Sequence, residues 1–202
     1  MFGLYAGHQA KGAGNTYLGS GAGFGQSAST GDNNVLVGYN AGYGLGSGSK
    51  NTYVGEGAGI NTSSGYENTS TGRRSLENIT TGTGNMALGY YAGGNITTGS
   101  GNIAIGYSSL QGNAVTGSHN IGIGDAAGYN LTSGGNNILI GKNAGRSTSI
   151  TDSLAQVDSG SNQIHIGNKT HTDAKVNISW TIVSDKRDKK IGRAHVWTPV
   201  TL

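Results

Sequence analysis

The sequence contains no cysteine, a single proline and few charged residues, and each shortage excludes a class of protein. Without cysteine the chain has no disulfides and no thiolate metal sites, and the redox compartment stays open. Charged residues make up only 11% of the chain, and helix formers such as Glu, Lys and Met are scarce, so we expect no long helix. The apolar runs are too short to cross a bilayer, which predicts no membrane insertion.

The formal net charge of +3 comes from the C-terminal end of the chain. Of the 13 basic and 10 acidic residues, five and two lie within residues 184–202, which leaves eight of each in residues 1–183. A neutral body has no basic stripe for phosphate groups. The sequence therefore predicts that nucleic acid is not a partner.

Glycine is abundant, with 39 residues of 202, and it recurs within a repeat. The repeated stretch is typified by "NMALGYYAG", "NIAIGYSSL" and "NILIGKNAG", and successive copies are 17 to 19 residues apart. "FGLYAG" near the N-terminus fits the second half of the unit, and "NQIHIGNK" at 162–169 is a looser ninth copy. The glycines at the centre of the clear copies are Gly19, Gly38, Gly55, Gly72, Gly89, Gly106, Gly124 and Gly141.

Each repeat places three alternating residues between an asparagine and the central glycine. The first and third are commonly aliphatic, as in Ile103 and Ile105, whereas the second varies. This alternation is typical of a short strand with one buried face. We expect the aliphatic positions to face the core and the variable position, which includes His165, to face outward. An Ala or Ser three residues after the glycine predicts a tightly packed corner.

A second, weaker stretch follows in each unit and begins with asparagine, as in "NITTG" and "NLTSG". Asn and Gly there are suited to left-handed turn positions. Asparagines in register can also form hydrogen-bonded ladders between successive coils. The asparagines concerned are Asn61, Asn78, Asn95, Asn113 and Asn130.

A fixed period of about 17 residues predicts an all-β fold, a β-solenoid or β-roll of about nine coils. With coils about 4.8 Å apart, the rod would be about 43 Å long. We assign residues 1–145 to the repeat solenoid, 146–161 to an insert or loop, and 162–183 to a last coil and terminal strand. Each coil buries few aliphatic side chains, which favours an oligomer that shares a further apolar face, although a monomeric solenoid stays open.

The quoted repeats resemble the collagen-binding-type head repeats of trimeric autotransporter adhesins. They also resemble the glycine- and asparagine-rich repeats of phage tail fibres and related surface fibres. Both families build trimeric β-rolls or β-helices, so the resemblance implies a homotrimeric fibre segment. It also implies a location in the virion, as part of a tail fibre, or on the bacterial cell surface.

"SDKRDKK", at residues 184–190, is similar to the start of the intramolecular chaperone domain of peptidase family S74, which ends many phage tail fibres. In that family the domain drives trimer assembly and then cuts itself off. The resemblance makes Ser184 the nucleophile, Lys189 its activating base and Ser184–Asp185 the cleaved bond. Only a truncated start of the domain is present, so the chain as given is not expected to be an enzyme. The alternative is a solvated basic end.

Residues 191–201 match one reading frame of a widely used sequencing adapter, provided that a TGA codon is read as Trp197. We interpret residues 191–202 as an adapter artefact.

The candidate recognition residues lie close to the central glycines. Tyr39, Tyr90 and Tyr107 each follow such a glycine and are expected to form an exposed stripe, for stacking on sugars or for packing between subunits. The atypical unit "NTSTGRRSLEN" adds Arg73 and Arg74, which suggest either a patch for acidic glycans or a weakened coil. The histidines lie in different units, so we expect no metal site, and no motif indicates a cofactor.

The sequence thus predicts a structural segment of a phage tail fibre or similar trimeric fibre. Its role would be attachment to a host-surface glycan or protein receptor, upstream of an S74 domain. The alternative is the head of a bacterial trimeric adhesin, and the second alternative is a monomeric glycan- or ice-binding solenoid.

Overall fold

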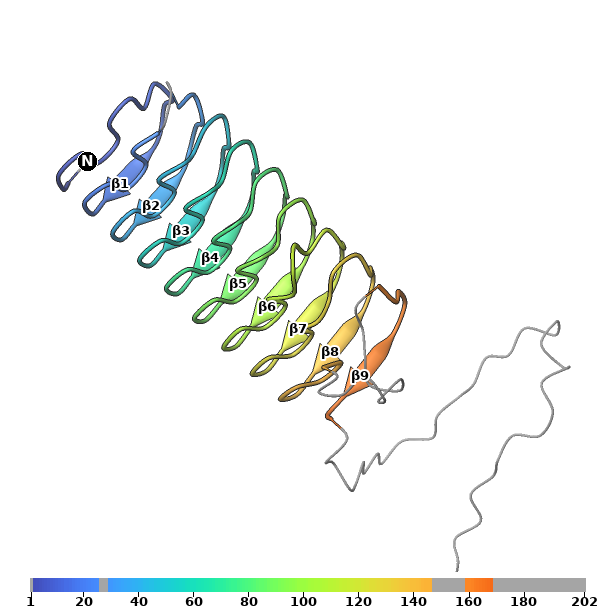
Figure 1. The fold of residues 1–202 in the computed structure, drawn as a ribbon. Coiled ribbons are helices and arrows are strands. Elements are labelled where there is room, and N and C mark those ends of the chain that lie inside the picture. The colour runs from blue at the N-terminus through green and yellow to red at the C-terminus, as the bar shows by residue number, and fades with distance from the viewer. Residues whose placement is uncertain (1, 26–28, 147–158, 169–202) are drawn as a thin grey trace, which may run out of the picture. The chain divides into compact units, whose positions relative to one another are not determined.

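The computed structural model describes residues 2–25, 29–146 and 159–168, and these residues form an all-β solenoid without a helix. Nine three-residue strands make one sheet in chain order, and Figure 1 shows them stacked along one side of the rod. The predicted fold class is therefore confirmed. The strands are β1 (Thr16–Leu18), β2 (Val35–Val37), β3 (Thr52–Val54), β4 (Thr69–Thr71), β5 (Met86–Leu88), β6 (Ile103–Ile105), β7 (Ile121–Ile123), β8 (Ile138–Ile140) and β9 (Ile164–Ile166).

Every neighbouring pair of strands is parallel, and equivalent residues of successive coils face one another. Tyr53 of β3 pairs with Ser70 of β4, which pairs with Ala87 of β5. Because parallel strands lie about 4.8 Å apart, each position of the repeat forms a straight column along the rod. Equivalent positions of the repeat therefore line up in columns along the rod. The side chains of one column are mostly exposed together or buried together.

The orientation of the strands is opposite to the one expected from the sequence. The variable second residue points into the coil, where Leu36, Tyr53 and Leu139 are fully buried. The aliphatic first and third residues lie on the outer face of the sheet, half-buried or exposed. His165 also occupies the inner position and is half-buried, with Nε2 3.3 Å from Gln163 Oε1.

The interior has room for one strand side chain in each coil because two other columns fill the remaining space. One is the predicted small-residue column, and all of its members are fully buried, which confirms the tight corner. The other comes from the second stretch of the repeat and includes Leu45, Ile79, Ile96 and Leu131. The small column consists of Ala22, Ala41, Ala58, Ser75, Ala92, Ser109, Ala127 and Ala144.

The glycine after each strand is required by close contact between coils. Gly72 has a φ of +136°, which L side chains rarely adopt, and a Cβ there would lie 2.4 Å from the Gly89 carbonyl oxygen. Gly55 makes the same approach to Gly72, and Gly3 begins the column against Gly19. The coils can stack at strand spacing only because this column carries no side chains.

The asparagine before each strand forms a buried ladder. Asn85 donates from its backbone N and from Nδ2 to Asn68 Oδ1, at 2.9 and 3.1 Å, and Nδ2 also donates to the Gly99 carbonyl at 2.9 Å. Asn102 repeats these bonds to Asn85 Oδ1. Each side-chain amide is thus satisfied by the neighbouring coils, as a buried polar group must be.

The asparagines of the second stretch form a shorter ladder. Asn61 Nδ2 donates to Asn78 Oδ1 at 2.9 Å, and Asn78 Nδ2 donates to Asn95 Oδ1 at 2.8 Å. The predicted ladder is therefore confirmed for these three residues. The predicted left-handed turn is wrong, because these asparagines do not have positive φ; residues such as Asn40 and Glu67 adopt it instead.

The atypical coil contains a buried polar group in the column that is mostly apolar. Ser70 Oγ is buried and has no hydrogen-bond partner among the described residues. We expect Ser70→Ala to stabilise the protein by about 1 kcal/mol, because an unsatisfied buried hydroxyl is removed. The melting temperature should rise by about 2–4 °C, measured by circular dichroism.

The matched control is Ser75→Ala, which removes a buried hydroxyl that donates to the Gly72 carbonyl at 2.9 Å. This variant should not gain stability. An unchanged or lower melting temperature for Ser70→Ala would contradict the idea that this coil is weakened by its serine.

Candidate binding groove

The corner after each strand glycine presents side chains in columns. The residues directly after these glycines, taken from all coils, form what we call the first corner column. The next residues form the second corner column, and the fifth residues after the glycines form the outer corner column. Backbone bonds hold the first two in register, since Ser108 N donates to the Tyr90 carbonyl at 3.0 Å and Ala126 N to the Tyr107 carbonyl at 2.8 Å. The side chains of one coil therefore lie beside those of the next.

The first corner column contains all three tyrosines that the sequence predicted as a stripe. Tyr90 and Tyr107 lie in adjacent coils with ring centroids 5.3 Å apart and ring planes at 17°, so they stack. Tyr39 lies three coils from Tyr90, with Glu56 and Arg73 between them. The column runs Ser20, Tyr39, Glu56, Arg73, Tyr90, Tyr107, Asp125 and Lys142.

The two arginines of the atypical coil are both paired with carboxylates. Arg73 Nε lies 3.2 Å from Glu56 Oε2, and the Arg73 guanidinium lies 5.6 Å from the Tyr90 ring centroid. Arg74 Nε lies 3.6 Å from Glu77 Oε1. The pair of arginines is therefore neutralised locally, which makes this surface less suited to an acidic ligand than its sequence suggested.

Arg74 also contacts the tyrosine in the next coil of the second corner column. Its Nη1 donates to the Tyr91 hydroxyl at 3.0 Å, and this bond raises the pKa of Arg74. A hydrogen bond with Glu77, followed by desolvation, raises the pKa of Tyr91. At neutral pH Arg74 thus stays positively charged and Tyr91 stays neutral. Both are large side chains, and they fill the second corner column in their two coils.

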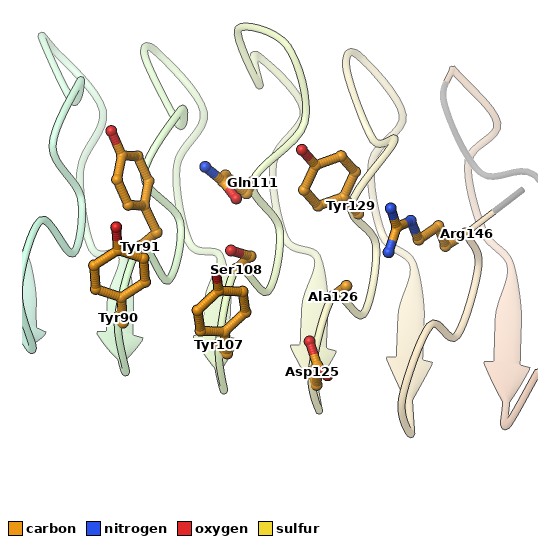
Figure 2. A pocket seen from close by; sticks show the side chains of 9 residues that line it. All are labelled: Tyr90, Tyr91, Tyr107, Ser108, Gln111, Asp125, Ala126, Tyr129 and Arg146. Carbon is orange, nitrogen blue, oxygen red and sulfur yellow. The ribbon is translucent and has the colours of Figure 1, made fainter. Parts of the chain in front are cut away.

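The second corner column changes from large to small side chains after Tyr91. Ser108 and Ala126 take the places that Arg74 and Tyr91 occupy in the preceding coils, and both are buried. The result is a groove of about 380 Å³. Figure 2 shows its layout: Tyr90, Tyr107 and Asp125 in one row, and Tyr91, Gln111, Tyr129 and Arg146 in the facing row, with Ser108 and Ala126 between them.

No protein-family model, curated protein or solved structure matches the chain.

The groove combines aromatic rings with one charge of each sign. The Asp125 carboxylate lies 3.8 Å from Lys142 Nζ, and its side chain is about half exposed (47%). Across the groove, the Arg146 guanidinium stacks 4.6 Å from the Tyr129 ring centroid, and its Nη1 donates to Asn143 Oδ1 at 3.1 Å. The lining thus offers hydrogen-bond donors and acceptors without a net charge.

Sequence reasoning identified Tyr90 and Tyr107 but missed the other members of the groove. Tyr91, Gln111, Asp125, Tyr129 and Arg146 occupy three different positions of the repeat, and no short motif connects them. Aligning the eight clear repeats in columns would have placed them side by side, because parallel in-register stacking brings equivalent positions together.

A second groove of about 470 Å³ lies over the ladder of the second stretch. Its asparagines bond to one another, and the hydroxyls of Thr80 and Thr97 donate to backbone carbonyls of the next coil, at 3.2 and 3.4 Å. These polar groups hold the coils together, so this face offers less to a ligand.

The remaining predicted site residues, Ser184 and Lys189, lie outside the described residues. Within residues 2–25, 29–146 and 159–168, no three His, Asp or Glu side chains gather in a way that would hold a metal ion. Over the same ranges the chain has no helix suited to crossing a membrane.

Proposed function

We propose that the chain is a structural segment of a homotrimeric surface fibre that attaches to a host cell. The observation that carries the proposal is the outer face of the sheet, where aliphatic side chains continue through nearly all of the nine strands and no other described residues cover them. Leu88 is 50% exposed and Ile123 is 37% exposed on this face. The exposed or half-buried aliphatic residues are Leu18, Val35, Val37, Val54, Met86, Leu88, Ile103, Ile105, Ile121, Ile123, Ile138, Ile140, Ile164 and Ile166.

An apolar strip of this kind supports subunit association. Three residues of a strand span about 10 Å, and nine coils extend about 43 Å, so the strip covers about 400 Å² in projection. This is the size at which exposed apolar patches on soluble proteins commonly mark interaction sites. A second copy has the same flat strip with the same repeat along the axis, so two or three copies can cover it symmetrically.

The trimer, rather than a dimer, follows from the resemblance to trimeric fibre repeats. Three flat faces can meet around one axis and form an apolar core between three solenoids. The glycine and asparagine columns then stabilise each solenoid, and the sheet faces hold the three together. The corner columns stay on the outside, where they are available for attachment.

Analytical ultracentrifugation tests the trimer directly. We expect the wild type to sediment as a trimer, and the double substitution Leu88→Lys with Ile123→Lys to shift it to monomer, because six buried lysines near one axis would be desolvated and repel one another. Tyr66→Lys is the control, since Tyr66 is 49% exposed and lies outside the sheet. This control should stay trimeric, and a monomeric wild type would overturn the proposal.

The sequence encoded after codon 190 would distinguish a phage tail fibre from a bacterial adhesin. We propose the tail fibre with an S74 chaperone domain, supported by the likeness of "SDKRDKK" to the start of that domain. Long-read sequencing of the native locus should find the rest of the domain, with virion genes nearby. A downstream membrane anchor would instead establish the bacterial adhesin, and confirmation of residues 191–202 as native coding sequence would remove the adapter interpretation.

A further inference from the structure

We propose that the groove between Tyr107 and Tyr129 binds an uncharged hexose-containing glycan, in the size range of a mono- or disaccharide. This inference rests on the proposed attachment function and names the ligand class and the site. It depends on three features: the space above Ser108 and Ala126, the free face of Tyr107, and the polar groups along both rows.

The space arises from a local change in the second corner column. Arg74 and Tyr91 fill the corner in the two preceding coils, whereas Ser108 and Ala126 are small and form the floor of a groove of about 380 Å³. This volume lies at the lower end of the range for small-molecule sites, about 300–1,000 Å³. Tyr91 closes one end of the groove, as Figure 2 shows.

An aromatic face is available in the groove because the tyrosine stack ends there. Tyr90 has Arg73 on one side and Tyr107 on the other, so both of its faces are covered. Tyr107 has Tyr90 on one side only, and the next member of its column is Asp125, which is not aromatic. Tyr107 is 59% exposed. The apolar face of a pyranose ring can stack on such a ring.

The polar groups suit sugar hydroxyls. The Asp125 carboxylate accepts hydrogen bonds only, whereas the Gln111 amide both donates and accepts. Arg146 has donors left after its bond to Asn143, because a guanidinium carries five. Carboxylate, amide and guanidinium beside aromatic rings therefore match a ligand with many hydroxyls and one apolar face.

The charges of the lining balance, which suits an uncharged ligand. Asp125 and Arg146 carry opposite charges at the two sides of the groove, and Arg73 and Arg74 are paired with Glu56 and Glu77. A sialic acid or sulfated sugar would meet the Asp125 carboxylate and the Arg146 guanidinium together, so the lining offers an anion no net attraction. The groove thus gives an anionic glycan no electrostatic advantage over an uncharged one.

The test uses the full chain on a printed array of neutral and sialylated oligosaccharides, followed by titration calorimetry with each glycan that binds. We expect binding to neutral hexose glycans and a weakening of about tenfold or more for Tyr107→Ala and for Asp125→Ala. Tyr39→Ala is the matched control, because it removes an equally exposed tyrosine of the same column outside the groove. It should bind as the wild type does.

Ser108→Tyr blocks the groove without a new backbone conformation. Ser108 has a φ of +51°, and Tyr91 occupies the equivalent position of the preceding coil at +55°. This variant should lose binding and keep the wild-type sedimentation and circular dichroism. Retained binding in Ser108→Tyr, binding restricted to sialylated glycans, or no glycan binding by a trimeric wild type would overturn the site. A monomeric wild type that binds neutral glycans would overturn the fibre and support the site.

Discussion

Asn85→Asp is expected to destabilise the protein by about 4 kcal/mol at neutral pH. The substitution removes the two Nδ2 hydrogen bonds, to Asn68 Oδ1 and to the Gly99 carbonyl, and brings a buried carboxylate against both oxygens. Because each coil of a solenoid contacts only its neighbours, a weakened central coil also uncouples the two halves of the rod. Chemical denaturation followed by circular dichroism measures the loss in free energy of unfolding.

The pH dependence of this variant provides a second measurement. Burial raises the pKa of the introduced carboxyl above its value in the unfolded chain. A group with a raised folded-state pKa favours folding at low pH and loses that contribution as the pH rises. The variant should therefore lose less stability, relative to wild type, at about pH 4 than at about pH 7.

Asn61→Asp is the control for Asn85→Asp. Asn61 is exposed and makes one side-chain bond, from Nδ2 to Asn78 Oδ1. Water can solvate the new carboxylate there, so the expected loss is below about 1 kcal/mol. Equal losses for the two variants would show that the buried ladder contributes no more than the exposed one.

Gly72→Ala is expected to cost about 3–5 kcal/mol, in the middle of the rod. Two effects combine: alanine is strained at a φ of +136°, and its Cβ would lie 2.4 Å from the Gly89 carbonyl oxygen. The contact is with backbone, so no side-chain rotation relieves it, and β4 and β5 must separate. Hydrogen exchange should show faster exchange for amides of these two strands than for those of β7 and β8.

Gly84→Asn is the matched control for the glycine column. Gly84 also has a positive φ, of +64°, but a Cβ there meets nothing within 4 Å. Equivalent positions of other coils hold Glu67 and His119 at φ values of +58° and +60°. The expected change is within about 0.5 kcal/mol. A loss as large as that of Gly72→Ala would mean that φ strain, rather than the contact between coils, requires the glycines.

The repeat period predicted the solenoid and its strands, yet it gave the wrong face to the core. Ile103 and Ile105 look like core residues because they are aliphatic at alternate positions, whereas Ala104 between them is fully buried. Alternation shows that a strand has two different faces, but not which face is closed by its own coil. The small-residue column was the better guide, since Ala92 and Ala127 indicate an interior too narrow for two large side chains in each strand.

The candidate groove was less predictable than the fold because it forms where side chains are smaller than at the equivalent positions of neighbouring coils. Tyr90 and Tyr107 attract attention as aromatic residues, but the groove exists because Ser108 and Ala126 are small where Arg74 and Tyr91 are large. This difference in side-chain size can be recognised only when equivalent positions of successive coils are compared. Asp125 and Arg146, in turn, are brought to opposite sides of the groove by the stacking of coils and not by any local motif.

The in-register stacking of equivalent residues also affects how a gene of this type can change in length. Recombination between matching codons of two coils removes or adds one whole coil, and the asparagine and glycine columns on either side then meet again in register. A deletion that is not a whole number of coils would bring side chains against the glycine backbone of the next coil, as at Gly72 and Gly89. Unequal crossing-over can therefore alter the length of the rod and the position of the groove along it. The stacking register of the coils is kept.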